Sequence, residues 1–193
     1  SQSIQYAVLI GDKKPNETQI LRHHSINNKP LRSINNFGCQ TVWEALLYNI
    51  NTRKRGNTNF LGTRSCLPNG KYADHYSWTT YQQAHDKAIA FAKAVIALEL
   101  CPEFVTNDNV VMRFMGIYAK NREEWVIADL ASHCNSITVV TLYDTLGLEA
   151  MQYIFEQTEL TTVVIEEKGL QNILSLARDK RVGKLKNLIL LDK

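Results

Sequence analysis

The chain has 193 residues, of which 45% are hydrophobic and 21% charged, and its formal net charge is +3. These values are ordinary for a globular protein, and a chain of this length buries enough surface to fold without disulfide or metal staples. The small net charge argues against a nucleic-acid-binding protein, which concentrates far more positive charge. No apolar run in the sequence approaches the roughly 20 residues of a membrane-spanning helix.

The cysteines are Cys39, Cys66, Cys101 and Cys134, and they form no CxxC pair. A zinc site requires short paired spacings, so we interpret the four as reduced thiols in an intracellular compartment. The histidines are isolated from such spacings as well, and His133 beside Cys134 is interpreted as a structural or solvated residue. We therefore predict no metal site.

Residues 1–70 are irregular and rich in asparagine, which predicts an N-terminal arm. Within the arm, Thr41-Val42-Trp43-Glu44 fits a capping box, and apolar residues at helical spacing predict one helix near residues 41–54. The run Arg53-Lys54-Arg55-Gly56 is expected to end this helix, because cations suit its C-terminus and glycine suits the cap. The basic triplet is interpreted as a solvated helix end in preference to a binding patch.

From residue 76 onward, short apolar segments alternate with amphipathic ones. This alternation predicts a doubly wound, mostly parallel α/β sheet, with residues 71–193 forming an α/β subdomain. Strands are expected at residues 76–79, 110–118, 137–142, 161–165 and 188–191, and helices at 80–100, 121–134, 148–155 and 169–177.

Two of these helices carry N-terminal signals. Thr80-Tyr81-Gln82-Gln83 fits a second capping box. Asn121 is expected to cap the helix that follows, with Glu123 and Glu124 in its first turn. The β-branched segment 137–142 lacks polar alternation, which predicts a strand covered on both faces.

Parallel α/β sheets bind ligands beyond the carboxyl ends of their strands. The segments in those positions are polar, namely 118–122, 143–145, 166–168 and 192–193. None of them contains G-x-G-x-x-G, G-x-x-x-x-G-K-[ST] or G-x-S-x-G. The sequence therefore lacks the motifs of a conventional dinucleotide-binding unit, a P-loop NTPase or an α/β-hydrolase.

Several segments together carry a family resemblance. They are Asn121-Arg122-x-Glu124-Trp125, Tyr143-Asp144-Thr145-Leu146-Gly147-x-Glu149-Ala150, Asn59-Phe60-Leu61-Gly62-Thr63-Arg64 and Trp78-x-x-Tyr81. In this order along the chain they resemble the N-terminal part of the long-chain acyl-CoA synthetases, members of the adenylate-forming (AMP-binding) superfamily. The resemblance covers nearly the whole chain.

The resemblance implies a ligase that activates a long-chain fatty acid with ATP to an acyl-adenylate, and then transfers the acyl group to CoA, with Mg²⁺ offsetting phosphate charge. It implies small-molecule partners, an intracellular location and possible peripheral membrane association. The family's ATP-binding and catalytic motifs are absent from this sequence. The chain therefore resembles an N-terminal fragment, which we predict to be inactive alone, to bind none of these cofactors, and to be prone to aggregation.

The resemblance also suggests roles for particular residues. Asn121, Arg122, Glu124, Trp125, Tyr143, Asp144, Thr145 and Gly147 are expected to build scaffold and the wall of the acyl tunnel, with Arg122 pairing with Asp144 or a nearby carbonyl. Lys168 and Arg178 are candidates to meet the nucleotide phosphates of CoA, and a solvated basic helix end is the alternative interpretation. No catalytic residue is expected in this chain.

Two other hypotheses stay open. The clean β/α alternation also suits a free-standing flavodoxin-like binding or scaffold module without catalysis. A luciferase-like or aryl-specific adenylating enzyme is the other possibility, although the run from Tyr143 to Gly147 favours the long-chain branch.

Overall fold

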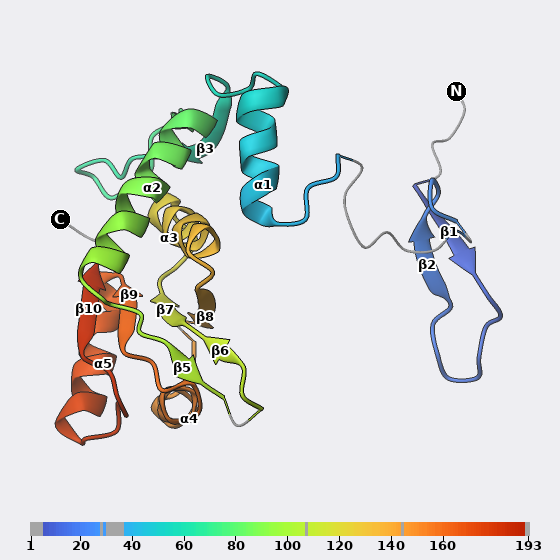
Figure 1. The fold of residues 1–193 in the computed structure, drawn as a ribbon. Helices are drawn as coiled ribbons and strands as arrows, with labels where there is room; N and C mark the ends of the chain where they lie inside the picture. The colour runs from blue at the N-terminus through green and yellow to red at the C-terminus, as the bar shows by residue number, and fades with distance from the viewer. Residues whose placement is uncertain (1–5, 28, 30–36, 107, 144, 192–193) are drawn as a thin grey trace. The chain divides into compact units, whose positions relative to one another are not determined.

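The structure is a computed structural model that describes residues 6–27, 29, 37–106, 108–143 and 145–191 (Figure 1). The chain divides into two units, Ser1–Gln40 and Thr41–Lys193. The sequence-based division at residue 70 differs from this one, because the helix and strand between residues 41 and 63 belong to the second unit.

The first unit contains an antiparallel hairpin of two strands, β1 (Ala7–Ile10) and β2 (Ile20–His23). The sequence predicted irregular chain here, since strands of four residues without polar alternation offer little periodicity to detect. Both strands leave apolar side chains exposed, including Leu9 and Leu21.

The second unit is built around a four-stranded parallel sheet with the strand order β10-β9-β7-β8. The chain enters at a central position, crosses to one edge and then returns to build the other half, so the predicted doubly wound sheet is confirmed. The strands are β7 (Phe114–Tyr118), β8 (Thr138–Leu142), β9 (Thr162–Ile165) and β10 (Asn187–Leu190).

Helices connect these strands and cover both faces. The helices are α2 (Tyr81–Ala97) before β7, α3 (Glu123–Cys134) between β7 and β8, α4 (Leu148–Thr158) between β8 and β9, and α5 (Glu167–Arg178) between β9 and β10. Each predicted helix of this region is present.

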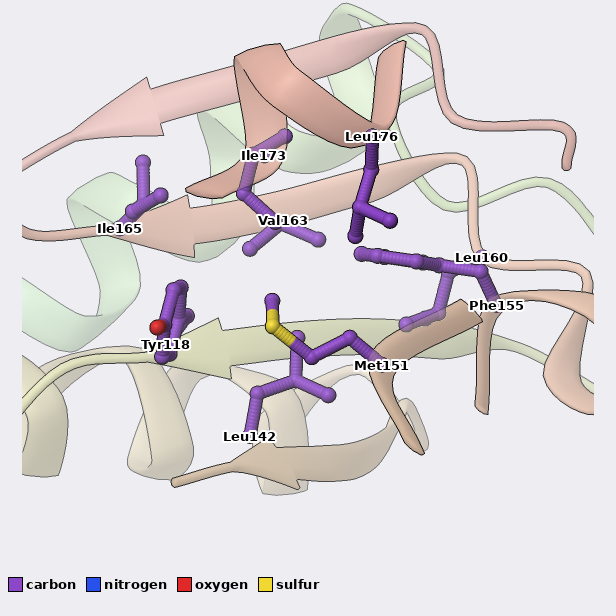
Figure 2. Packing of buried hydrophobic residues seen from close by; sticks show 9 residues of the cluster. All are labelled: Tyr118, Leu142, Met151, Phe155, Leu160, Val163, Ile165, Ile173 and Leu176. Atoms are coloured by element: carbon purple, nitrogen blue, oxygen red, sulfur yellow. The ribbon is translucent and has the colours of Figure 1, made fainter. Parts of the chain in front are cut away.

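Side chains of β7 point alternately to the two faces of the sheet. Met115 and Ile117 join a buried cluster with residues of α2 and α3. Tyr118 points to the opposite face, under α4 and α5 (Figure 2). The other members of that second cluster are Leu142, Met151, Phe155, Leu160, Val163, Ile165, Ile173 and Leu176.

The strands of the parallel sheet differ in how much of their side chains is buried. β9 is central, and all four of its residues are buried. β8 lies at an edge, and only Leu142 among its residues is buried. Val139 packs on the cluster of one face and Val140 on the cluster of the other, so the predicted cover on both faces is confirmed but is only partial. A short β-branched run has the same composition at the centre and at the edge of a sheet, and only the strand order separates the two.

Two predicted strands differ from the observed ones. The strand expected at 76–79 is β4 (Ser77–Thr80), which pairs with β3 (Asn59–Thr63) in a separate antiparallel pair and is not part of the parallel sheet. The strand expected at 110–118 is divided, because β6 (Val111–Met112) turns back on β5 (Phe104–Val105) before β7 begins.

The first helix of the second unit begins as predicted. Thr41 and Glu44 form both hydrogen bonds of the capping box, and α1 (Val42–Leu47) continues into a π-helical turn, η1 (Tyr48–Thr52). The predicted glycine cap is wrong. Lys54 takes the left-handed conformation with φ of 54°, while the N–H of Arg53 bonds to the carbonyl of Tyr48.

Of the predicted caps for the next two helices, one is confirmed and one is wrong. Thr80 and Gln83 form the second capping box of α2, as predicted. Asn121 does not cap α3, because the cap position belongs to Arg122, which has extended backbone and no side-chain capping bond. The first turn of α3 does hold Glu123 and Glu124.

Candidate functional site

The carboxyl edge of the parallel sheet carries a cavity of about 640 Å³ between the ends of β7 and β8. Its lining comes from the loop after β7, the first turn of α3, the end of β8 and the loop after β8. The lining residues are Ala119, Lys120, Asn121, Trp125, Thr141 and Tyr143. We call this the carboxyl-edge cavity.

Each part of the carboxyl-edge cavity is positioned by a regular element. β7 ends at Tyr118, so the next three residues project beyond the sheet. Trp125 is half-buried and packs against the cluster of Met115 and Ile117. Tyr143 follows β8 directly and is 64% exposed, so its ring is available to a ligand.

In a doubly wound sheet, the usual ligand crevice lies where the strand order reverses, here between β7 and β9. In this protein that position is filled. The N–H of Glu166 donates to the carbonyl of Tyr118 at 3.2 Å, and Asn172 donates from Nδ2 to the Tyr118 hydroxyl at 2.9 Å. Gly169 of α5 lies against the Tyr118 ring. The open space is therefore one strand away, beside β8.

A polar network holds the start of α3, next to the carboxyl-edge cavity. Thr79 of β4 donates to Oε2 of Glu123 at 2.9 Å, and Lys87 of α2 forms an ion pair with the same carboxylate. The Glu123 side chain is only 16% exposed. Sequence inspection did not identify Thr79 and Lys87 as partners, because they lie 44 and 36 residues away along the chain.

The predicted partner of Arg122 cannot be followed in the structure, since Asp144 lies outside the described residues. Arg122 pairs with Glu124, with Nε 2.7 Å from Oε2. Thr145 is exposed, and Gly147 is the cap residue of α4.

The two candidate cations for CoA do not lie together. Lys168 is in the first turn of α5 and Arg178 is in its last turn. Ten helical residues span about 15 Å, so one phosphate group cannot contact both side chains. Both are exposed.

The titratable groups with clearly perturbed pKa lie away from the carboxyl-edge cavity. Burial raises the pKa of the Cys101 thiol to about 11, partly opposed by Arg113. Burial also raises the pKa of Asp129 on α3, and this shift is opposed by His133.

No group of three or more His, Cys, Asp or Glu side chains among the described residues is placed to hold a metal ion. No helix among the same residues is long and apolar enough to cross a membrane.

Comparison with known protein families identifies the class of protein. The sequence profile of the AMP-binding enzymes matches residues 59–193, which is more than half of the chain. The chain therefore belongs to the AMP-binding enzyme family.

Individual relatives show which members of the family this chain is similar to. Fatty acyl-CoA synthetase A of Dictyostelium discoideum is 36% identical over 130 residues, covering 67% of this chain and 18% of the relative. Long-chain-fatty-acid–CoA ligase 5 of Rattus norvegicus is 34% identical over 129 residues, covering 66% of this chain and 18% of the relative. The chain thus spans about a fifth of the length of these curated relatives.

Among solved structures, the adenylation domain of a carboxylate reductase from Mycobacterium chelonae superposes with a TM-score of 0.64. The match covers 82% of this chain and 24% of that one at 17% identity. At this level of sequence identity, the structural similarity shows that the two chains share a fold. The family match favours the ligase hypothesis, and no comparison supports a free-standing flavodoxin-like module.

Proposed function

We propose that this chain is the N-terminal part of a ligase that converts long-chain fatty acids to acyl-CoA through an acyl-adenylate. The observation that carries the proposal is the family match, together with the sequence identity to fatty acyl-CoA synthetases over two thirds of the chain. Under this proposal the enzyme is intracellular, and any membrane association is peripheral.

The proposed reaction has two steps. The fatty acid carboxylate attacks the α-phosphate of ATP, which releases pyrophosphate, and the CoA thiol then displaces AMP from the acyl-adenylate. A magnesium ion would offset phosphate charge in the first step. The described residues contain no carboxylate cluster that fits Mg²⁺, so they are not proposed to hold it.

For the described residues we propose a binding role at the carboxyl-edge cavity, in place of the sequence-based prediction that the chain alone binds no cofactor. Lys120 supplies a cation, Trp125 and Tyr143 supply aromatic surface, and Asn121 supplies amide donors and acceptors. This combination suits a ligand with a flat ring system and phosphate groups, which describes the nucleotide end of CoA. Lys168 remains a second candidate for a phosphate contact, from the neighbouring end of α5.

The test is titration calorimetry, which measures the affinity of the 193-residue chain for CoA and, separately, for pantetheine. Tyr143→Ala is expected to weaken CoA binding about tenfold, which corresponds to the loss of one stacking contact. Tyr153→Ala is the matched control, because Tyr153 is equally exposed, at 62%, on α4. Equal binding of CoA and pantetheine, or an equal effect of the two substitutions, would overturn this assignment.

We further propose that the 193-residue chain catalyses neither step, because its sequence lacks the family's triphosphate-binding motif. The measurement is ATP–pyrophosphate exchange by the purified chain. A signal above that of a mock preparation would refute the proposal.

A further inference from the structure

The positive charge of the chain is concentrated in one short segment, residues 178–186. This segment contains a single acid, Asp179, and five cations, so its formal charge is +4. The cations are Arg178, Lys180, Arg181, Lys184 and Lys186. The whole chain carries only +3, so the charges outside the segment sum to a slightly negative value. We call residues 178–186 the basic segment.

The basic segment lies at the amino edge of the parallel sheet. It begins at Arg178, the last residue of α5, and it ends directly before Asn187, the first residue of β10. The carboxyl-edge cavity is at the opposite edge of the sheet, and its lining contains no residue of the basic segment. The proposed nucleotide site therefore does not account for this concentration of charge.

Most of this charge is not neutralised by nearby acids. Only Lys184 of the segment forms an ion pair among the described residues, with its Nζ 2.6 Å from Oε2 of Glu159. The cations without an ion pair in the same part of the chain are Arg178, Lys180, Arg181 and Lys186. These four cations are thus left with one acid, Asp179, inside the segment.

An exposed apolar surface lies at the same edge of the sheet. β6 ends at Met112 and β7 begins two residues later, so the antiparallel β5–β6 pair also lies at the amino ends of the parallel strands. Val105 of β5 is directly opposite Val111 of β6. These two residues are 59% and 58% exposed, and Val110 beside them is 52% exposed. The β5–β6 pair therefore presents three valines to solvent.

Strand alternation explains why the valines are exposed. The neighbouring cross-strand pair, Phe104 and Met112, points to the other side of the two strands. Both residues are half-buried, and the ring centroid of Phe104 lies 6.0 Å from that of Phe114 at the start of β7. The side with Phe104 packs on the sheet, so the side with the valines is turned outward.

The basic segment and the β5–β6 pair are neighbours in space. A cavity of about 210 Å³ is lined by Phe104 of β5 as well as by Lys184 and Lys186 of the basic segment. Both acids in this lining are engaged in ion pairs, Glu103 with Arg113 and the other with Lys184. We call the basic segment together with Val105, Val110 and Val111 the amino-edge surface.

We propose that the amino-edge surface binds a lipid bilayer that contains anionic phospholipids. Lysine and arginine side chains near a membrane are attracted by the negative charge of its headgroups, and exposed aliphatic side chains enter the interface. Nucleic acids share the negative charge, but basic residues and aromatic rings bind them, and valines add little to such a contact. The combination of cations with valines therefore favours the bilayer.

This inference rests on the proposed function only in assigning a surface to its peripheral membrane association. Asp108 in the β5–β6 turn and Asp179 are exposed acids on or beside the amino-edge surface. They reduce its attraction for anionic lipid, so we expect reversible binding that depends on salt.

The first experiment measures cosedimentation of the 193-residue chain with vesicles of phosphatidylcholine, with or without about 30% phosphatidylserine. Binding to the anionic vesicles is expected to be at least about tenfold tighter and to weaken as salt is raised. A DNA duplex at the same phosphate concentration is expected to compete poorly. Equal binding to both kinds of vesicle, binding to neither, or complete displacement by the duplex overturns the proposal.

The second experiment tests the cations. Lys180→Gln combined with Lys186→Gln is expected to weaken binding to the anionic vesicles by about tenfold or more, since each cation near the surface contributes about fivefold. The matched control is Lys54→Gln with Lys71→Gln, which removes the same charge from exposed positions outside the amino-edge surface. Lys54 also shares the left-handed backbone of Lys180, with φ of 54° and 59°. An equal effect of the two double variants overturns the assignment.

The third experiment tests the valines. Val105→Thr combined with Val111→Thr keeps the shape and β-branching of both side chains, so the β5–β6 pair is retained. Binding to the anionic vesicles is expected to weaken about threefold to tenfold, because two methyl groups that enter the interface become hydroxyls. Val42→Thr, at a valine that is 52% exposed on α1, is the control and leaves binding unchanged. Unchanged binding of the double variant overturns the proposed surface.

CoA titration of the same variants separates this inference from the proposed function. The affinity for CoA is expected to stay unchanged, because all substituted residues of the amino-edge surface lie at the opposite edge of the sheet from the carboxyl-edge cavity. A chain that binds CoA but no anionic vesicle overturns this inference alone. A chain that binds anionic vesicles but no CoA supports it and overturns the nucleotide site.

Discussion

The backbone of Gly169 and the ring of Tyr118 approach so closely that no side chain fits between them. A Cβ atom added at Gly169 would lie 2.6 Å from Cε1 of Tyr118 and 2.8 Å from its Cδ1. Tyr118 ends β7 and is 2% exposed, and Gly169 lies in the first turn of α5. This contact sets how closely α5 approaches the sheet at the point where the strand order reverses.

Gly169→Ala is expected to lower the free energy of unfolding by about 1–3 kcal/mol, because the buried ring or the helix must shift to admit the methyl group. Urea denaturation measures the change. Gly56→Ala is the control, because a Cβ there would meet its neighbours at 3.6 Å or more and its φ is not positive. A stability equal to that of the unaltered chain would show that α5 tolerates a larger separation than the structure gives it.

Thr79→Val is expected to destabilise the protein by about 1.5–3 kcal/mol, since the charged Glu123 side chain loses a hydrogen bond in a half-buried position. A double-mutant cycle with Lys87→Met measures whether the three groups act together, and a coupling of about 0.5–3 kcal/mol is expected. Thr138→Val on the exposed start of β8 serves as the control. Additive effects would mean that Thr79 and Lys87 act independently.

The stability of the chain is expected to depend on the ionisation of Asp129. Burial raises the pKa of this carboxyl in the folded state, although His133 opposes the shift. The contribution of Asp129 is therefore fully present below its unfolded pKa and is lost as pH rises through its folded pKa. Asp129→Asn removes this loss, so the variant should gain stability relative to the unaltered chain between pH 3 and pH 7. Chemical denaturation across this range tests the sign, and a constant difference would contradict it.

Cys101 is expected to resist alkylation in the folded protein, because burial raises the pKa of its thiol to about 11 and the side chain is 6% exposed. Cys66 is exposed and should react with iodoacetamide well before Cys101 at pH 8. Mass spectrometry of timed samples gives the order of modification. In denaturant the two cysteines should react at similar rates, which serves as the control.

The open side of β10 is the expected source of self-association. β10 is an edge strand, and Leu190 on it is 48% exposed. Leu190→Lys should reduce light scattering on storage with little change in stability, because a charge on an exposed edge strand opposes pairing between chains. Ile189→Lys, at a half-buried position packed on the Met115 cluster, should instead destabilise the fold. Unchanged scattering of the Leu190→Lys variant would place the contact elsewhere.

Structural signals that act within a few residues could be recognised from the sequence alone. Both capping boxes, at Thr41 and at Thr80, close between residues three apart, so neither depends on the rest of the fold. The cap at Asn121 failed because a cap depends on where the preceding strand lets the helix begin, and that position is Arg122. Lys54 in the left-handed region is likewise imposed by neighbouring backbone bonds, in place of the glycine that local preference would select.

The candidate sites were only partly predictable. The rule that ligands bind beyond the carboxyl ends of parallel strands directed attention to residues 118–122 and 143–145, and both segments line the carboxyl-edge cavity. Lys168 and Arg178 appeared to be neighbours by charge alone, and the length of α5 separates them. The convergence of the β5–β6 pair with the basic segment has no sequence signal, since nothing in either segment specifies the other.

Hydrophobic periodicity and short motifs are local properties of the chain, so the alternation of strands and helices and the family could both be recognised from the sequence. The edge strands and the position of the open space became known only from the folded structure. Strand order is set by packing between distant segments. The Tyr118 ring, closed over by Gly169, fills the point where the strand order reverses and leaves the cavity beside β8.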